Sequence, residues 1–194
     1  RKAMALSISV EVDCVDFSRY SLPGYGYMGI GQWMYLAIQQ DSTAEITQAE
    51  EELDEWGALS LSGLNKYEMN LETAKQLLID DGWTLNQDGQ PFVEGTDTVR
   101  YKQVDGELMG LVIRWAKMED SLAAEQLEAV LPDALAQIGM ELEVTEVPFV
   151  ELLEHYYRQE ERTYDMFYLA TNFISIFDPY FVFNTADEYQ GTQN

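Results

Sequence analysis

The chain has 194 residues, with 35 acids against 11 bases and a formal net charge of −24. This length and a hydrophobic fraction of 46% allow a single domain with a sizeable core. The charge disfavours nucleic acid and anionic membrane surfaces as partners, because a phosphate backbone needs a positive protein face. The only cysteine, Cys14, excludes both a disulfide within the chain and a cysteine-based metal site.

The first predicted element is a helix over Arg1–Val10, with Ala3, Met4, Leu6 and Ile8 toward a core. No run approaches the ~18 apolar residues of a membrane span, and no signal peptide is visible. The chain opens inside a predicted helix and closes on a polar Gly-Thr-Gln-Asn. We therefore expect it to be part of a longer protein.

The segment Gly24–Gly29 has the spacing G-x-G-x-x-G. A dinucleotide-binding loop with this spacing directly follows a strand, whereas Ser21 and Pro23 precede it here. We therefore interpret the segment as a flexible glycine loop that exposes Tyr25 and Tyr27.

Two acidic segments resemble cation sites only in composition. Asp41–Trp56 is rich in glutamate, and Asn86–Gly89 contains a fragment of a calcium loop. A hard cation needs convergent oxygen ligands around a turn-forming glycine, and neither segment has the full pattern. We predict a solvated helix over the first and no bound metal or cofactor.

A well-signalled helix is predicted over Asn70–Gly82. Asn70 is a good N-cap, and Gly82 is a good terminator. Its apolar stripe comprises Leu71, Ala74, Leu77 and Leu78, and Trp83 is expected to fold back onto it. The turn signals Asp88-Gly89 and Asp105-Gly106 then predict small hairpins between Thr84 and Leu111.

The centre of the chain reads as strand, helix, strand. Leu108–Trp115 is a β-prone apolar run, Asp120–Ile138 has helical periodicity ending before Gly139, and Glu141–Val147 alternates. This order predicts a right-handed parallel βαβ unit, and ligands in such sheets meet the carboxyl ends of the strands. Pro132 costs the helix ~3 kcal/mol, which flanking apolar burial offsets, so we expect a kink or a restart there.

A second amphipathic helix is predicted over Pro148–Arg162. Its apolar positions are Phe149, Leu152, Leu153, Tyr156 and Tyr157. The only histidine, His155, falls opposite this stripe and is expected on the surface. Tyr164–Ala170 then predicts a strand covered on both faces. The following segment, 171–179, is unusually apolar for a loop, so it either buries against another lobe or lines a pocket.

Several of these segments resemble, in order and spacing, the bacterial extracytoplasmic solute-binding proteins of peptide and nickel ABC transporters (family 5). The matching segments are Arg1–Leu6, Tyr67 with Asn70–Trp83, Asn86–Gly89, Ala124–Glu125 through Val144, Tyr164–Met166 and Asp178-Pro179. The resemblance covers most of the chain apart from residues 41–56. It implies a periplasmic-binding-protein-like (type 2) α/β lobe over residues 1–194, with a mixed sheet, flanking helices and a second lobe elsewhere.

The resemblance also implies a function. The lobe would belong to the substrate-binding component of an importer, which takes a peptide or similar solute in the cleft between two lobes. Its partners would be transporter permeases, and it would lie outside the cytoplasm, lipid-anchored or periplasmic. The expected ligand-binding residues are Thr171, Asn172, Phe173, Ile174, Ser175 and Phe177, with Tyr25 and Tyr27 as further candidates.

One departure concerns the ligand. Peptide-binding members carry an acid shortly before the Asp-Pro, where it pairs with the peptide amino terminus. Residues 172–176 here contain no carboxylate, and a buried ammonium without an anion is costly. A different solute, or a neutral pocket using Asn172 and Ser175, is therefore an equal alternative.

Two other function classes remain open from the sequence. A hydrolytic enzyme is disfavoured, because there is no Gly-x-Ser-x-Gly elbow and only one cysteine and one histidine. An acidic extracellular protein-interaction domain is the other alternative, and association that weakens with salt would support it.

Overall fold

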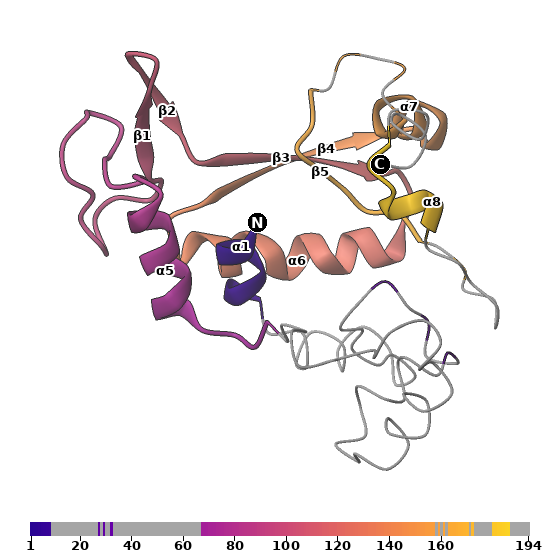
Figure 1. The fold of residues 1–194 in the computed structure, drawn as a ribbon, viewed down its shortest axis with the longest axis horizontal. Helices are drawn as coiled ribbons and strands as arrows, with labels where there is room; N and C mark the ends of the chain where they lie inside the picture. The colour runs from indigo at the N-terminus through magenta and orange to yellow at the C-terminus, as the bar shows by residue number, and fades with distance from the viewer. Residues whose placement is uncertain are drawn as a thin grey trace, which may run out of the picture.

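The computed structural model describes residues 1–8, 27, 29, 32, 67–157, 159, 161, 163–170, 172 and 180–186 (Figure 1). The predicted acidic helix at 41–56 and most of the glycine loop lie outside these residues. The described strands form two sheets. One is a two-stranded hairpin, and the other has three strands in the order β4-β3-β5.

Two helices that are distant in sequence pack side by side. Helix α1 spans Lys2–Ser7 and helix α5 spans Leu71–Asp80, and the Asn70 amide donates to the Leu6 carbonyl at 2.8 Å. Asn70 caps α5 as predicted, since its Oδ1 accepts from the Thr73 amide at 2.9 Å. The predicted stripe of α5 is confirmed: Ala74 and Leu78 are buried, with Leu71, Leu77 and Trp83 packed on the same cluster.

The hairpin consists of β1 (Tyr101–Val104) and β2 (Glu107–Gly110), which pair antiparallel around Asp105 and Gly106. The predicted turn there is confirmed, with both residues at positive φ. The predicted strand over Leu108–Trp115 is wrong as a single element, because its first part belongs to β2 and its second to β3. Leu111 separates them, with its amide bound to the Arg100 carbonyl and its carbonyl to the Glu141 amide.

The predicted βαβ unit is confirmed. Strand β3 (Val112–Met118) pairs in parallel with β4 (Glu141–Val147), and α6 (Leu122–Ala136) connects them. Ser121 caps α6, and Gly139 has φ +79° beyond its end. Pro132 lies inside α6 without a restart, because the surrounding burial of Leu131 and Leu135 holds the helix in place.

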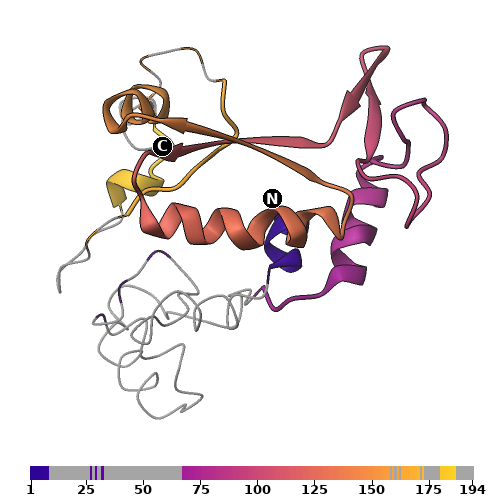
Figure 2. The ribbon, with the colours of Figure 1, turned by 180° about the vertical axis from the view of Figure 1, so that it is seen from behind.

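The three-stranded sheet lies between two helical layers. In Figures 1 and 2, α6 lies along one face and α7 (Phe149–Tyr156) lies on the other. Trp115 of β3 faces α6 and packs on Ala124 and Leu131, whereas the next residue, Ala116, packs on Leu152 of α7. This alternation along one strand is the expected period of two, and it gives the sheet a core on each face.

Three predictions for the second amphipathic helix are wrong. Helix α7 ends at Tyr156 instead of Arg162, and Phe149 at its start is 50% exposed instead of buried. His155 is not a surface residue, since its side chain is 14% exposed and its ring meets Tyr164 edge-on at 5.0 Å. The segment leading into β5 passes over this side of the helix, which helical periodicity alone does not reveal.

Strand β5 is shorter than predicted, spanning Met166–Phe167 in place of Tyr164–Ala170. It pairs in parallel with the middle of β3. Asp165 fixes its start, because its carboxylate accepts from the Arg114 amide at 3.0 Å and its amide donates to the Arg114 carbonyl at 2.8 Å. The expected cover on both faces is confirmed: Met166 packs on the α6 side and Phe167 on the α7 side. A short helix, α8 (Tyr180–Phe183), follows.

Candidate functional site

The carboxyl edge of the parallel sheet brings together the starts of two helices. Strand β3 leads into α6 through Ser121, and β4 leads directly into α7 through Pro148. Both views show α8 near this edge (Figures 1 and 2). Ligands of open α/β sheets bind outside the carboxyl ends of the strands, because the loops there are free to vary while the sheet stays fixed. This edge is therefore the candidate site.

Large apolar side chains are exposed along this edge. Leu122 begins α6, and Phe149 and Val150 begin α7, with exposed fractions of 70%, 50% and 67%. Tyr180 and Phe183 of α8 are also exposed. Single exposed apolar residues need no explanation, but several at the starts of adjacent elements indicate a surface that a ligand or another protein surface covers. We call Leu122, Phe149, Val150, Tyr180 and Phe183 the carboxyl-edge patch.

Tyr27 joins this patch from a distant part of the chain. Its ring meets Phe183 edge-on, with centroids 5.5 Å apart and an interplanar angle of 84°. Burial raises the pKa of the Tyr156 phenol, and the neighbouring phenols of Tyr157 and Tyr27 raise it further. Tyr156 also meets Phe167 of β5 edge-on at 6.1 Å. Aromatic pairs thus occur both between α7 and β5 and between Tyr27 and α8.

The predicted site residues are only partly described. Tyr27 is 40% exposed and contacts Phe183, and Asn172 is exposed shortly after β5. The other six lie outside the described residues: Tyr25, Thr171, Phe173, Ile174, Ser175 and Phe177. Their assignment to a ligand site therefore remains a prediction.

Sequence reasoning missed all five residues of the patch as site candidates: Phe183, Tyr180, Leu122, Phe149 and Val150. The first two follow Asp178-Pro179 in a segment whose helical form was not predicted. Leu122 lies within the periodic segment predicted over Asp120–Ile138, but it is the first residue of α6 and is 70% exposed. Its place directly after the Ser121 N-cap is the signal that would have identified it, because a first-turn residue lies at the strand end.

Candidate metal ligands and the single histidine can be located among the described residues. Within the part of the chain that the structure describes, no group of three His, Cys, Asp or Glu side chains is arranged to hold a metal ion. Asn86 does not offer a calcium ligand set either, because its Oδ1 accepts from the amides of Asp88 and Gln90 within its own turn. The Nδ1 of His155 is buried and makes no hydrogen bond to any described residue.

No described helix has the length and apolar character of a membrane span. No protein-family model matches the chain, and no curated protein matches its sequence. Solved structures do match.

The oligopeptide-binding protein AppA of Bacillus subtilis, in complex with a nonapeptide, has a TM-score of 0.66 at 16% identity, over 100% of this chain and 32% of that one. An oligopeptide-binding protein of Thermus thermophilus, complexed with a pentapeptide, has a TM-score of 0.57 at 15% identity. The match covers 82% of this chain and 21% of that chain. The periplasmic binding protein MelB of Agrobacterium fabrum, in complex with stachyose, has a TM-score of 0.51 at 14% identity. The match covers 80% of this chain and 19% of that chain.

These similarities confirm the fold that the sequence resemblance implied. The neighbours are solute-binding proteins, and at identities of 14–16% the likeness is one of fold. The chain spans about a third of the first neighbour and about a fifth of the second. It has the periplasmic-binding-protein-like α/β fold of these proteins over part of their length.

Proposed function

We propose that this chain is one lobe of the substrate-binding component of an ABC importer. It would bind an oligopeptide or a similar small solute between its carboxyl edge and a second lobe. The observation that carries the proposal is the carboxyl-edge patch, where Leu122, Phe149 and Phe183 are exposed beside the ends of parallel strands. Structural neighbours that bind a nonapeptide, a pentapeptide and stachyose support a solute in this size range.

The residues at the carboxyl edge suit the binding of a solute better than the catalysis of a reaction. Aromatic rings such as Tyr27 and Phe183 provide contact area at low entropic cost, and a few polar groups such as Asn172 fix orientation. A binding protein needs no acid–base pair, and the neighbours are binding proteins. The proposal places the protein outside the cytoplasm, with permease subunits as its partners and any lipid anchor outside these residues.

Segment 172–176 contains no charged residue, and this affects which solutes the cleft is expected to bind. No carboxylate in this segment is available for a peptide ammonium. We therefore expect the cleft to bind a peptide through its backbone and apolar side chains, or to bind an uncharged solute. A ligand with a blocked amino terminus should bind as well as one with a free terminus.

The test is a thermal-shift screen of the complete protein that contains this chain. The panel comprises short peptides with free and acetylated amino termini, amino acids, oligosaccharides and metal chelates. A ligand that binds only the folded state stabilises it by ~2.7 kcal/mol at a hundredfold excess over its Kd. A saturable shift with one class supports the proposal, and equal shifts with free and acetylated peptides support a neutral site.

Two results would overturn the proposal. One is the absence of a shift with every class, together with a salt-sensitive association with another protein, which favours the acidic interaction domain. The other is turnover of a panel member, which favours an enzyme. A preference for free over acetylated peptides would overturn only the neutral-site part.

A further inference from the structure

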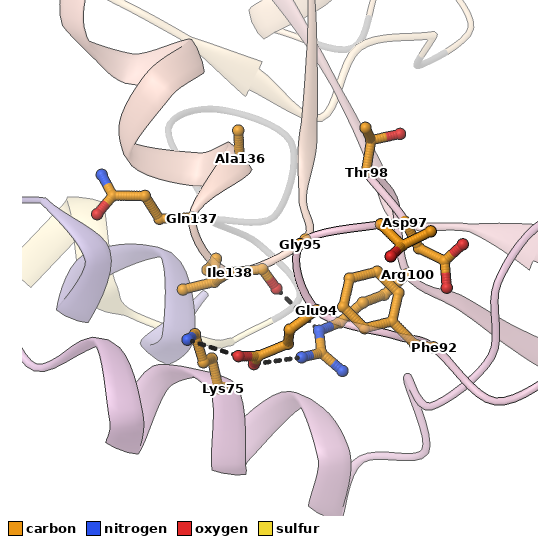
Figure 3. Close-up of a pocket in the computed structure, with 12 residues that line it drawn as sticks. Lys75, Phe92, Glu94, Gly95, Asp97, Thr98, Arg100, Ala136, Gln137 and Ile138 are labelled. Carbon is orange, nitrogen blue, oxygen red and sulfur yellow. Dashed lines mark hydrogen bonds and ion pairs between the residues drawn. The ribbon is translucent and has the colours of Figure 1, made fainter.

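A cavity of about 390 Å³ lies at the opposite end of the sheet from the carboxyl edge. Its lining comes from Lys75 of α5, the loop 92–98, Arg100 and the end of α6 with Gly139 (Figure 3). Gly139 precedes β4, and the Arg100 amide donates to its carbonyl at 2.8 Å. The volume lies within the range of small-molecule sites, near its lower end. This cavity is separate from the proposed solute site.

The base of the cavity carries a buried cation. The Arg100 side chain is 4% exposed, and its guanidinium lies 4.1 Å from the Phe92 ring centre. Its Nε donates to the Ile138 carbonyl at 2.9 Å, and Nη1 donates to the Trp83 carbonyl at 3.2 Å. These bonds leave Nη2 without a hydrogen bond to any described residue. Burial lowers the pKa of Arg100, and the Glu94 carboxylate opposes this.

One exposed carboxylate is shared by two cations at this point. Glu94 lies 3.6 Å from Arg100 Nη2 and 3.3 Å from Lys75 Nζ, and its side chain is 60% exposed. Figure 3 shows its carboxylate between the two cationic groups. The other acid of the lining, Asp97, accepts from the Val93 amide at 2.7 Å and from Asn86, within its own loop. Asp97 is therefore already engaged, and Glu94 is the lining acid that pairs with both Lys75 and Arg100.

We propose that this cavity is a second binding site, for a small monocarboxylate, in which the ligand carboxylate replaces Glu94 between Arg100 and Lys75. Glu94 shows that Arg100 and Lys75 can bind a carboxylate. Its carboxylate lies at the edge of the Arg100 guanidinium, whose face Phe92 covers. The exchange keeps one negative charge beside the buried cation, so it avoids the cost of an unpaired charge. Glu94 can rehydrate when it leaves, since it is on the exposed turn around Gly95.

The experiment measures binding of sodium propionate to the intact protein by saturation-transfer difference NMR, at constant ionic strength. Propionamide, which has the same shape without the charge, is the control ligand. Binding of propionate that saturates, without binding of propionamide, is expected. Glu94→Gln removes the internal competitor and should lower the Kd for propionate about tenfold, whereas Lys75→Met should raise it about tenfold.

Glu72→Gln is the matched control variant. Glu72 also pairs with Lys75, at 3.6 Å, but its side chain is 90% exposed and it does not line the cavity. Its substitution should leave the Kd unchanged, as should Phe183→Ala at the carboxyl edge. None of these substitutions removes a carbonyl that accepts a hydrogen bond from Arg100, so each variant should keep the guanidinium in place. The proposal fails if propionate does not bind, if propionamide binds as well, or if the Kd is the same in Glu94→Gln and Lys75→Met as in the unsubstituted protein.

Discussion

The Nζ atom of Lys117 on β3 lies 2.6 Å from the Glu128 carboxylate on α6, so an ion pair joins the sheet to the helix over it. A second carboxylate, Glu146 on β4, lies 2.7 Å from the same Nζ. The Lys117 side chain is 6% exposed, whereas the glutamates are 40% and 54% exposed. The ammonium is therefore held between two carboxylates that themselves reach water.

We expect Lys117→Met to lower the free energy of unfolding by about 1–2 kcal/mol. Breaking a fully buried pair costs roughly 3–5 kcal/mol, but here both glutamates can rehydrate. Urea denaturation measures the difference. Arg114→Met is the control, because Arg114 and Glu143 are 3.8 Å apart and about 60% exposed, and it should cost under ~0.5 kcal/mol. Equal losses in the two variants would contradict the structural role of Lys117.

The same ion pairs predict a stability that declines at alkaline pH. Hydrogen bonds to Glu128 and then to Glu146 raise the pKa of Lys117 above its ordinary value. A raised folded-state pKa gives stability that is complete below the unfolded value of ~10.4 and is lost as pH rises through the folded value. The difference in unfolding free energy between the unsubstituted protein and Lys117→Met should therefore be constant from about pH 7 to 9 and shrink above about pH 10.5. A difference that grows in that range would refute the assignment.

Gly139→Ala should destabilise the protein more than other glycine substitutions. Gly139 has φ +79°, and a Cβ atom there would lie 2.7 Å from Cγ of Arg100, which the Ile138 carbonyl holds in place. We expect a loss of about 2–4 kcal/mol, from backbone strain and overpacking together. Gly89→Ala is the matched control: its φ is +72°, but nothing lies within 4 Å of the new Cβ. It should cost about 1 kcal/mol, and an equal cost at both positions would mean that Arg100 moves aside.

The elements that the sequence predicted well are those with local signals at both ends. Asn70 and Gly82 bracket α5, and Glu141–Val147 alternates over the full length of β4. The parallel pairing of β3 with β4 followed from the crossover helix between them. In each case a local pattern and the global fold agree, so sequence reasoning was sufficient.

The misplaced elements depend on contacts between distant residues. Strand β5 begins where it does because Asp165 binds the backbone of Arg114, 51 residues away, and His155 is covered because Tyr164 folds over it. The contact of Tyr27 with Phe183 is a similar case. Periodicity reports which residues share a face of one element, but it does not report what covers that face. The sequence predicted the edge of the sheet and named Tyr27 as a candidate, whereas the contact of Tyr27 with Phe183 and the exposure of Tyr180 and Leu122 came from the structure.

Removing the Phe183 ring should weaken solute binding without unfolding the protein. Its side chain is 61% exposed and contacts the Tyr27 ring edge-on, so Phe183→Ala should lower stability by less than about 1 kcal/mol. If the carboxyl-edge patch binds the solute, loss of one aromatic contact should raise the Kd about five- to tenfold. Titration calorimetry of the complete protein with the solute found by the screen measures this change.

The matched control for this substitution is Met109→Ala. Met109 is also an exposed apolar residue, at 44%, but it is on the hairpin, away from the carboxyl edge (Figure 1). Its substitution should leave the Kd unchanged, because the β1–β2 hairpin contributes nothing to the patch. If Phe183→Ala and Met109→Ala bind the solute equally well, the solute does not contact Phe183, and the binding surface must lie elsewhere on the protein.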